Sequence, residues 1–388
     1  MGKGSNSTVS DHTRRSRWPV VCALLSAVLL CGCAGPARLA AEMRDPRVSP
    51  RREMELRERL IAMTPASDPY LAEVFFPIGL YDVPESALTE VAAGGFNLVV
   101  NSDTTPGYLA RAGAAGLRVI PYIRLHAMAE DAAQFRGRRA PWAWYLVDEP
   151  DLNRVEPAEY HALARKLRKL DPDRPIFLTV LLPQNYPFYA VEADIVAPNL
   201  YPIRQIPPER NNLMEVAYAV DAARETRPRA VWVVLQAFCG EPIWPRPPTP
   251  EELRSMAWLA LNHGATGVIY FSYRCGDGQV IVDSPLYPAV VRLNGEISAL
   301  RGALMTPPLD CEIAEDVDCS LRAFAGMHLL IAVNPDPAAR AARLRLPESL
   351  RNAPVQELFR KQAGAAMTDG TLELDFSPFQ ARVFWIGP

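Results

Sequence analysis

This sequence of 388 residues has little net charge and few histidines, and it lacks the cysteine spacings typical of zinc sites. The formal net charge is −3, so the composition carries no electrostatic signature of nucleic-acid binding. Only four of the 41 Lys and Arg residues are lysine, which we attribute to coding bias. Five histidines and the lack of any C-x-x-C pair argue against a structural zinc site. We therefore expect no nucleic-acid partner, no metal and no cofactor.

A long apolar run is missing too, because the one near the N-terminus spans only residues 19–30 (PVVCALLSAVLL). It is too short for a mature membrane-spanning helix, and arginines within residues 14–17 precede it, as in a secretion signal. The following LCGC resembles the lipobox of bacterial lipoproteins, which implies cleavage before Cys33 and lipidation of that cysteine. Ala34 replaces the aspartate associated with inner-membrane retention, so we expect an anchor in the outer membrane of a bacterial cell envelope. A plain cleaved signal peptide is the alternative.

Export changes the meaning of the remaining cysteines. Behind Cys33 the chain keeps Cys239, Cys275, Cys311 and Cys319, an even number in an oxidising compartment. A Cys311–Cys319 disulfide would close a short loop, and Cys239–Cys275 would join two neighbouring strand ends. We predict both disulfides.

Short apolar runs alternate with amphipathic helical stretches from residue 69 to 304. Before them, residues 1–33 form the signal peptide with its lipobox, and residues 34–68 are expected to form a tether with one charged helix. Eight apolar runs separated by helices predict an α/β fold with a parallel sheet, and this length is typical of a (β/α)8 TIM barrel. A doubly wound open sheet is the alternative, but no G-x-G-x-x-G opens a helix. The expected strands are residues 75–81, 96–100, 117–123, 142–147, 175–181, 194–201, 230–238 and 266–273.

The character of the sequence changes over residues 305–388. Short alternating runs are separated there by glycine, proline and Asp-Gly, a pattern typical of antiparallel strands. We predict a small all-β sandwich domain. Because it has no cluster of acidic residues or histidine, we expect a structural or substrate-presenting role.

Barrels of this kind carry their reactive groups at the C-terminal ends of the strands. The fifth expected strand ends in Leu181-Leu182-Pro183 and offers no polar group there. The polar candidates at the other strand ends are Asp82, Asn101, Asp103, Arg124, His126, Asp148, Glu149, Asn199, Tyr201, Gln236, Glu241, Tyr273, Arg274 and Asp277.

Two adjacent carboxylates end the fourth strand in the stretch WAWYLVDEPD. If Glu149 faces the barrel axis, alternation places Tyr145 beneath it and puts Asp148 on the opposite side with Trp144. The next helix begins near residue 156, too far away for either carboxylate to cap it. We therefore interpret Glu149 and Asp148 as candidate catalytic residues.

Several stretches resemble the (β/α)8-barrel glycoside hydrolases, most closely bacterial members distantly akin to the retaining cellulase and β-galactosidase clan. These stretches are WYLVDEP, DIVAPNLYP and PTPEELRSMAWLALNHGATGVIYFSY, and the resemblance covers residues 74–304. It implies that Glu149 matches the acid/base glutamate of the fourth strand, with Asp148 in place of the preceding asparagine. It also implies that Tyr201 matches an aromatic residue at the tip of the sixth strand.

The seventh strand departs from this pattern, because Gln236 stands where the clan places its nucleophilic glutamate. Glycoside hydrolysis normally uses two carboxyl groups, ~5–5.5 Å apart for retention or ~6.5–9.5 Å apart for inversion. Glu241, on the loop after this strand, could supply the second group. A rim aspartate (Asp82, Asp103 or Asp277) could instead activate water for inversion. Alternatively, the site binds sugars without cleaving them. A substrate-assisted route is less favoured, because the D-x-D-x-E pattern is absent.

Substrate contacts are expected from side chains at the same end of the barrel. Trp244, in the loop EPIWPRPPTP, either stacks on a sugar ring or anchors its loop. Arg124 and Arg274 either grip an acidic sugar or form ion pairs with Glu149. The predicted substrate-binding residues are Tyr201, Gln236, Arg124, Asn199, Trp244 and Tyr273.

Two functions follow from these observations. The first is a lipid-anchored glycoside hydrolase acting on an extracellular or periplasmic glycan, with Glu149 as general acid/base and Asp148 or Glu241 assisting. A largely apolar surround would keep Glu149 protonated near neutrality. The second is a non-catalytic carbohydrate-binding or envelope-scaffold lipoprotein built on a hydrolase-like barrel.

Overall fold

The computed structural model describes residues 35–63, 75–138, 140–204, 211–240, 242–276, 278–311, 313–360 and 367–387. Four predicted features therefore lie outside the described residues: the signal peptide with Cys33, the end of the tether, Glu241 and Asp277.

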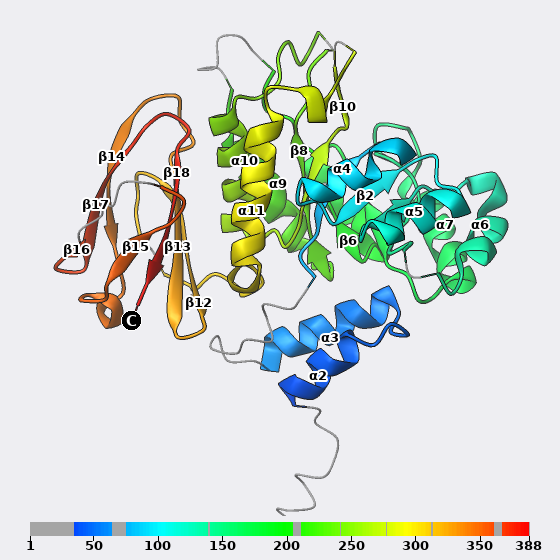
Figure 1. Ribbon diagram of the computed structural model, residues 1–388, viewed down its shortest axis with the longest axis horizontal. Coiled ribbons are helices and arrows are strands. Elements are labelled where there is room, and N and C mark those ends of the chain that lie inside the picture. The colour runs from blue at the N-terminus through cyan, green and yellow to red at the C-terminus, as the bar shows by residue number, and fades with distance from the viewer. Residues whose placement is uncertain are drawn as a thin grey trace, which may run out of the picture.

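Eight parallel strands close into a barrel (Figure 1). Hydrogen-bonded pairing runs from β4 through β5 and β6 to β7, and from β8 through β9, β1 and β2 to β3. β7 and β8 form one strand interrupted at Trp232, and single bridges at Val119–Pro141 and Tyr122–Tyr145 join β3 to β4. The strands are β1 (Ile78–Tyr81), β2 (Leu98–Asn101), β3 (Arg118–Pro121), β4 (Trp144–Tyr145), β5 (Ile176–Leu178), β6 (Ile195–Val196), β7 (Ala230–Val231), β8 (Val233–Gln236) and β9 (Val268–Phe271). The predicted (β/α)8 barrel is confirmed.

Helices cover the outside of the barrel, and local sequence fixes where several of them begin. In α10, Thr249 and Glu252 form a capping box around Pro250. The covering helices are α4 (Leu88–Ala93), α5 (Pro106–Ala114), α6 (Met128–Phe135), α7 (Pro157–Leu170), α8 (Tyr186–Tyr189), α9 (Met214–Glu225), α10 (Pro250–Asn262) and α11 (Tyr287–Leu304). Short 3₁₀ turns are η2 (Glu85–Ala87), η3 (Leu125–Ala127), η4 (Pro183–Asn185), η5 (Ala190–Glu192), η7 (Ile281–Asp283) and η8 (Glu348–Leu350). A hairpin of β10 (Arg274–Gly276) and β11 (Gln279–Val280) follows β9.

Alternation along the strands divides the apolar side chains between two layers. Tyr145 and Phe177 belong to the cluster inside the barrel, where the rings of Trp142 and Trp232 stack with centroids 5.4 Å apart. Trp144, next to Tyr145, packs in the outer layer between strands and helices. The interior is thus a filled core, and a ligand can only meet it at its ends.

The C-terminal residues form two antiparallel sheets, which confirms the predicted all-β domain. One sheet has the order β12 (Asp318–Phe324), β13 (Met327–Val333), β18 (Ala381–Ile386), β15 (Val355–Glu357), and the other β14 (Arg340–Arg345), β17 (Thr371–Phe376), β16 (Met367–Thr368). In β13, Leu330 and Ala332 face the core between the sheets, whereas Leu329, Ile331 and Val333 pack in the layer that includes the barrel helices. Figure 1 shows this domain beside α10 and α11.

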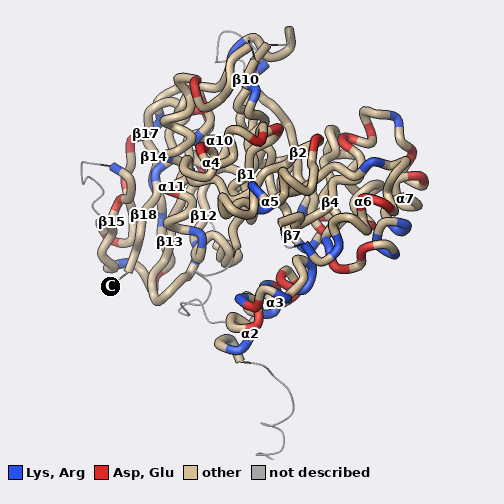
Figure 2. Tube along the Cα trace, turned by 45° about the vertical axis from the view of Figure 1, so that its right-hand side comes forward, with Lys and Arg blue, Asp and Glu red and all other residues tan. Residues whose placement is uncertain are grey.

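Two helices from the predicted tether, α2 (Pro36–Met43) and α3 (Pro50–Met63), pack against the N-terminal end of the barrel. Met54 joins the cluster inside the barrel, and Leu56 and Leu60 are fully buried. Figure 2 shows that both helices carry charged residues of both signs. This segment is therefore an integral layer of the fold. Within the residues described, no helix has the length and hydropathy to cross a membrane.

Two of the four cysteines lie side by side. The backbone N–H of Cys239 donates to the carbonyl of Cys275 (2.9 Å), just beyond β8 and β9. A disulfide between these two residues stays a prediction. Cys311 and Cys319 are free thiols, so their predicted disulfide is not formed in this structure. Burial raises the pKa of the Cys319 thiol. Cys319 lies on β12, which pairs with β13, and its side chain packs at the edge of the sandwich core.

Candidate active site

Asp148 is held at the C-terminal rim of the barrel by two hydroxyl groups from the strands. Its Oδ1 accepts hydrogen bonds from the Tyr145 hydroxyl and from Thr179 Oγ1, the latter at 3.1 Å. Tyr145 and Thr179 are almost fully buried. Asp148 therefore points toward the barrel axis, and the predicted placement beside Trp144 is wrong.

The backbone departs from a regular strand at the two carboxylates. Ladder pairing of β4 ends at Tyr145, and Glu149 has a φ of +38°, in the left-handed region that non-glycine residues rarely adopt. Strict alternation thus stops before the two carboxylates, so both face the rim. Residues held in such conformations cluster at functional sites.

Glu149 is half-buried, and among the described residues its carboxylate has one hydrogen-bond partner. Asn199, which follows β6, donates its Nδ2 to Glu149 Oε1, and the Glu149 N–H lies 3.4 Å from Thr179 Oγ1. Burial and the charge of Asp148 raise the pKa of Glu149, while the hydrogen bond from Asn199 partly opposes them. A carboxyl group that retains its proton toward neutral pH is suited to general acid catalysis.

Asn199 also presents an unused acceptor. The residue is only 4% exposed, and no donor among the described residues reaches its Oδ1. A buried carbonyl without a partner is costly, so this oxygen is positioned to accept a hydrogen bond from a bound hydroxyl group.

Asp82 is a rim aspartate that interacts electrostatically with Asp148. It follows β1, is half-buried, and has a φ of +56°. Burial and the charge of Asp148 raise the pKa of Asp82, with Arg274 acting in the opposite direction. Asp103 has a weaker effect on this pKa and is itself exposed. Asp82, Asp148 and Glu149, the rim carboxylates, thus surround one mouth.

Aromatic rings line one side of the mouth. Tyr201 meets Phe238, Trp244 and Phe271 with ring centroids 5.0, 5.8 and 5.9 Å apart. Burial and the charge of Glu149 raise the pKa of Tyr201, which places its ring beside that carboxylate. Trp244 remains half-buried, and its indole Nε1 is buried without a partner among the described residues. Of the predicted aromatic contacts, Tyr201 therefore lies near Glu149, and Trp244 packs against Tyr201.

Two other predicted contacts lie elsewhere. Gln236 is 0% exposed, and its amide exchanges hydrogen bonds of 2.9 and 3.2 Å with the backbone of Ile203. It connects the ends of the sixth and seventh strands, and this placement does not support substrate binding. Tyr273 packs in the outer layer, because the chain leaves the barrel after Phe271 and turns into β10.

The arginines do not pair with Glu149. Arg124 binds Asp131 on α6 through its backbone N–H (2.9 Å) and its Nε (3.0 Å). Its side chain is 56% exposed. Arg274 is exposed and acts electrostatically on Asp82. A grip on an acidic sugar therefore stays a prediction for both arginines. His126 is exposed on η3.

Sequence reasoning missed two residues that organise the site. Thr179 lies two positions before the apolar Leu181 taken as the strand end, and its hydroxyl contacts both Asp148 and the backbone of Glu149. Asp151 accepts the N–H groups of Leu181 (3.1 Å) and the following leucine (3.0 Å), which ties the fourth loop to the fifth. A lone threonine within PIFLTVL was the only available signal. No group of three or more possible metal ligands is found in the part of the chain that the structure describes.

Comparison with known proteins gives the same architecture. A family model described as β-galactosidase, glycoside hydrolase family 42, matches residues 157–280, which begin after Glu149. None of the curated proteins matches this sequence.

Solved structures extend the likeness to most of the chain. A putative alpha-galactosidase from Bacteroides fragilis shares 11% identity, with a TM-score of 0.55 over 80% of this chain and 79% of that one. A family 39 glycoside hydrolase from Bacteroides cellulosilyticus shares 12% identity, with a TM-score of 0.54 over 81% of this chain and 82% of that one. A family 30 endoxylanase from Clostridium papyrosolvens shares 10% identity, with a TM-score of 0.51 over 81% of this chain and 96% of that one. The sequence match and the fold agree with a member of the (β/α)8 glycoside-hydrolase superfamily, as the sequence motifs predicted.

Proposed function

We propose that this protein hydrolyses glycosidic bonds, with Glu149 as the general acid. The observation that carries the proposal is the half-buried Glu149 carboxyl, whose pKa is raised by burial and by Asp148 beside it. Protonated Glu149 donates its proton to the leaving glycosidic oxygen. Asn199 holds the carboxyl group in place through its Nδ2 and offers its free Oδ1 to a sugar hydroxyl. The aromatic rings around Tyr201 give the sugar an apolar face to stack on.

We assign the second carboxylate to Asp82 and therefore propose an inverting reaction. Gln236 cannot act as a nucleophile, and its amide is occupied by the backbone of Ile203. Asp148 is held by Tyr145 and Thr179, which suits a fixed charge that keeps the neighbouring acid protonated. Asp82 directly follows β1, across the mouth from β4, where it can activate water on the opposite face of the sugar.

The acid role is tested by Glu149→Gln against a panel of aryl glycosides and polysaccharides. Where the wild type turns over a substrate, the variant is expected to lose activity by about 10²–10⁴-fold, because one proton donor is removed. Glu159→Gln, an exposed site on α7, is the matched control and should keep full activity. Equal turnover of the two variants would remove Glu149 from the mechanism.

The base role is tested separately, by Asp82→Asn and by the anomer first formed. Asp82→Asn should lose activity while retaining its fold, and NMR should detect product of inverted configuration. Retained configuration would exclude this assignment while leaving Glu149 as the acid.

A non-catalytic sugar-binding protein is the second candidate. It is favoured because the expected nucleophile position holds Gln236, a buried amide. It predicts saturable glycan binding without turnover, and binding would then weaken in Asn199→Ala but not in Glu159→Gln.

The proposed location is the bacterial outer membrane, through a lipid on Cys33. Only two residues separate Cys33 from α2, so the N-terminal end of the barrel would face the bilayer and the mouth would face away. Cys33→Ala should release the protein from the membrane fraction and abolish palmitate incorporation. An unchanged distribution would exclude the anchor.

A further inference from the structure

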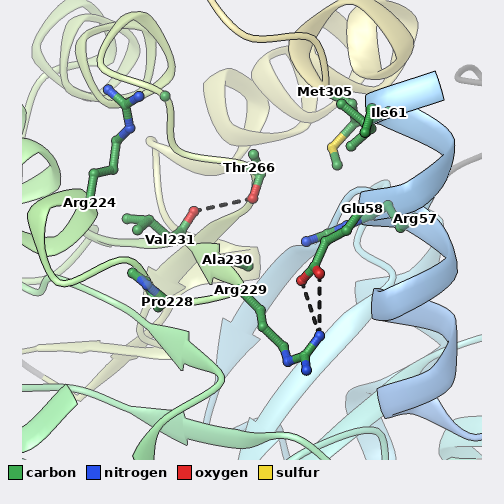
Figure 3. Close-up of a pocket in the computed structure, with 12 residues that line it drawn as sticks. Arg57, Glu58, Ile61, Arg224, Pro228, Arg229, Ala230, Val231, Thr266 and Met305 are labelled. Carbon is green, nitrogen blue, oxygen red and sulfur yellow. Dashed lines mark hydrogen bonds and ion pairs between the residues drawn. The ribbon is translucent and has the colours of Figure 1, made fainter. Parts of the chain in front are cut away.

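A pocket of about 370 Å³ opens at the N-terminal end of the barrel, opposite the mouth (Figure 3). α3 forms one wall, and the starts of β7 and β9 form the other. Figure 3 shows Arg57 and Glu58 on α3 facing Ala230 and Arg229 across this space. Its volume lies within the range of small-molecule sites, which is ~300–1,000 Å³.

Arg57 is the unusual residue of this pocket. It is only 5% exposed, and its Nε is buried without a hydrogen-bond partner. No acidic side chain of the described segments lies within ion-pair distance, although Glu53 and Glu58 act on it through space. Burying an unpaired cation costs several kcal/mol, so the fold retains Arg57 at a cost that a bound anion would offset.

The rest of the lining is also positive. Arg229 is neutralised by Glu58 and Asp194, each 3.3 Å away. Arg224 is exposed on α9, and its Nη1 donates to the carbonyl of His263 (3.1 Å). The charged residues of the lining are three arginines and one glutamate, a surplus of two positive charges.

Apolar side chains complete the pocket and distinguish it from a simple ion site. Ile61 on α3 and Met305 after α11 line it beside the arginines. A second void on the far side of Arg57 measures about 10 Å³, enough for roughly one water and too small for an anion. A ligand must therefore approach through the larger pocket, and it should carry an anionic group beside an apolar one.

We propose that this pocket binds a phosphate group, with Arg57 as its innermost donor. The group comes either from an anionic phospholipid headgroup or from free phosphate. The apolar lining favours the lipid, and so does the position of α2 directly after Cys33, which would hold this end of the barrel against the bilayer. That orientation rests on the proposed anchor, whereas the phosphate site itself does not.

The test uses the chain from Ala34 onward, which carries no lipid, and measures co-sedimentation with two kinds of vesicle. One is phosphatidylcholine alone, and the other contains phosphatidylglycerol. A calorimetric titration with inorganic phosphate distinguishes the free anion. Arg57→Gln should weaken binding on the order of tenfold, because one charge-assisted donor is lost. Arg59→Gln is the matched control, since Arg59 is exposed on the same helix outside the pocket and its loss removes the same charge.

Two outcomes support the site and two overturn it. Arg57-dependent binding to phosphatidylglycerol vesicles supports a lipid headgroup, and Arg57-dependent binding of inorganic phosphate alone supports the free anion. Equal weakening in Arg57→Gln and Arg59→Gln indicates unspecific attraction and overturns the site. The site is also overturned if neither the phosphatidylglycerol vesicles nor inorganic phosphate binds. Arg57→Met serves as a second variant: it should raise the Tm of the free protein and abolish any ligand-induced shift in Tm. Hydrolysis of a glycan by each variant reports on the mouth independently.

Discussion

His263 connects the barrel to the C-terminal domain through two carboxylates, which makes the junction sensitive to alkali. It caps the C-terminus of α10, with its Nδ1 2.7 Å from Asp221 on α9 and its Nε2 2.8 Å from Asp318 on β12. Either deprotonation of the imidazolium or the substitution His263→Gln should weaken this connection and lower the free energy of unfolding.

The size of the effect follows from the pKa of His263. Burial disfavours the charged ring, but the hydrogen bonds and charges of Asp221 and Asp318 outweigh burial and raise the pKa from 6.5 to about 9. Such a shift corresponds to about 3 kcal/mol. Asp221 is 45% exposed, so solvent screens its share, and we expect about 2 kcal/mol. Because the folded-state pKa is the higher one, this stabilisation is complete below about pH 6.5 and is lost as the pH rises through 9.

Urea unfolding between pH 6 and pH 10 measures the effect. The wild type should exceed His263→Gln by about 2 kcal/mol at pH 6, and the difference should shrink as the pH passes 9. His126→Gln, at an exposed position on η3, should follow the wild type throughout. A difference between wild type and His263→Gln that stays constant from pH 6 to pH 10 would refute the reasoning.

Three further predictions concern the rim of the barrel. Gln236→Glu should cost roughly 1–3 kcal/mol in urea unfolding without improving hydrolysis, because a carboxylate would face the backbone carbonyl that its amide now binds. Asn199→Ala should lower kcat/KM about tenfold. It should also move the alkaline limb of the pH–rate profile upward, since the hydrogen bond that lowers the pKa of Glu149 is lost. Arg124→Gln should cost roughly 1–3 kcal/mol in urea unfolding, because it leaves the buried carboxylate of Asp131 without its guanidinium partner.

The architecture was predictable because buried strands and helices require apolar residues at regular positions in the sequence. Seven of the eight strands fall within the apolar runs, since a parallel strand covered on both sides needs apolar residues nearly throughout. The remaining strand, β2, extends one residue beyond its run, to Asn101. The alternation of Gly, Pro and polar residues after residue 305 marked the β domain in the same way. The polar residues at the strand ends, such as Glu149 and Tyr201, could be placed near the mouth once the strands were known.

The details of the site were not predictable, because they depend on backbone angles and on partners distant in sequence. The ladder of β4 ends at Tyr145 and Glu149 has a positive φ, and no local pattern in the sequence reveals this irregular backbone. Thr179 matters only because β5 lies beside β4, which brings its hydroxyl to Asp148. Gln236 was aligned with a nucleophile, yet its direction is set by Ile203 on another loop.

The two-sided packing of β13 bears on how this chain can be divided. Leu329, Ile331 and Val333 belong to the layer that holds the barrel helices, while Leu330 and Ala332 belong to the sandwich. A protein shortened after α11 would expose the apolar surface that this strand covers, and an isolated sandwich would expose the strand itself. The two parts are therefore inseparable as folding units, and exchange of the C-terminal domain between related proteins requires the outer faces of α10 and α11 to change with it.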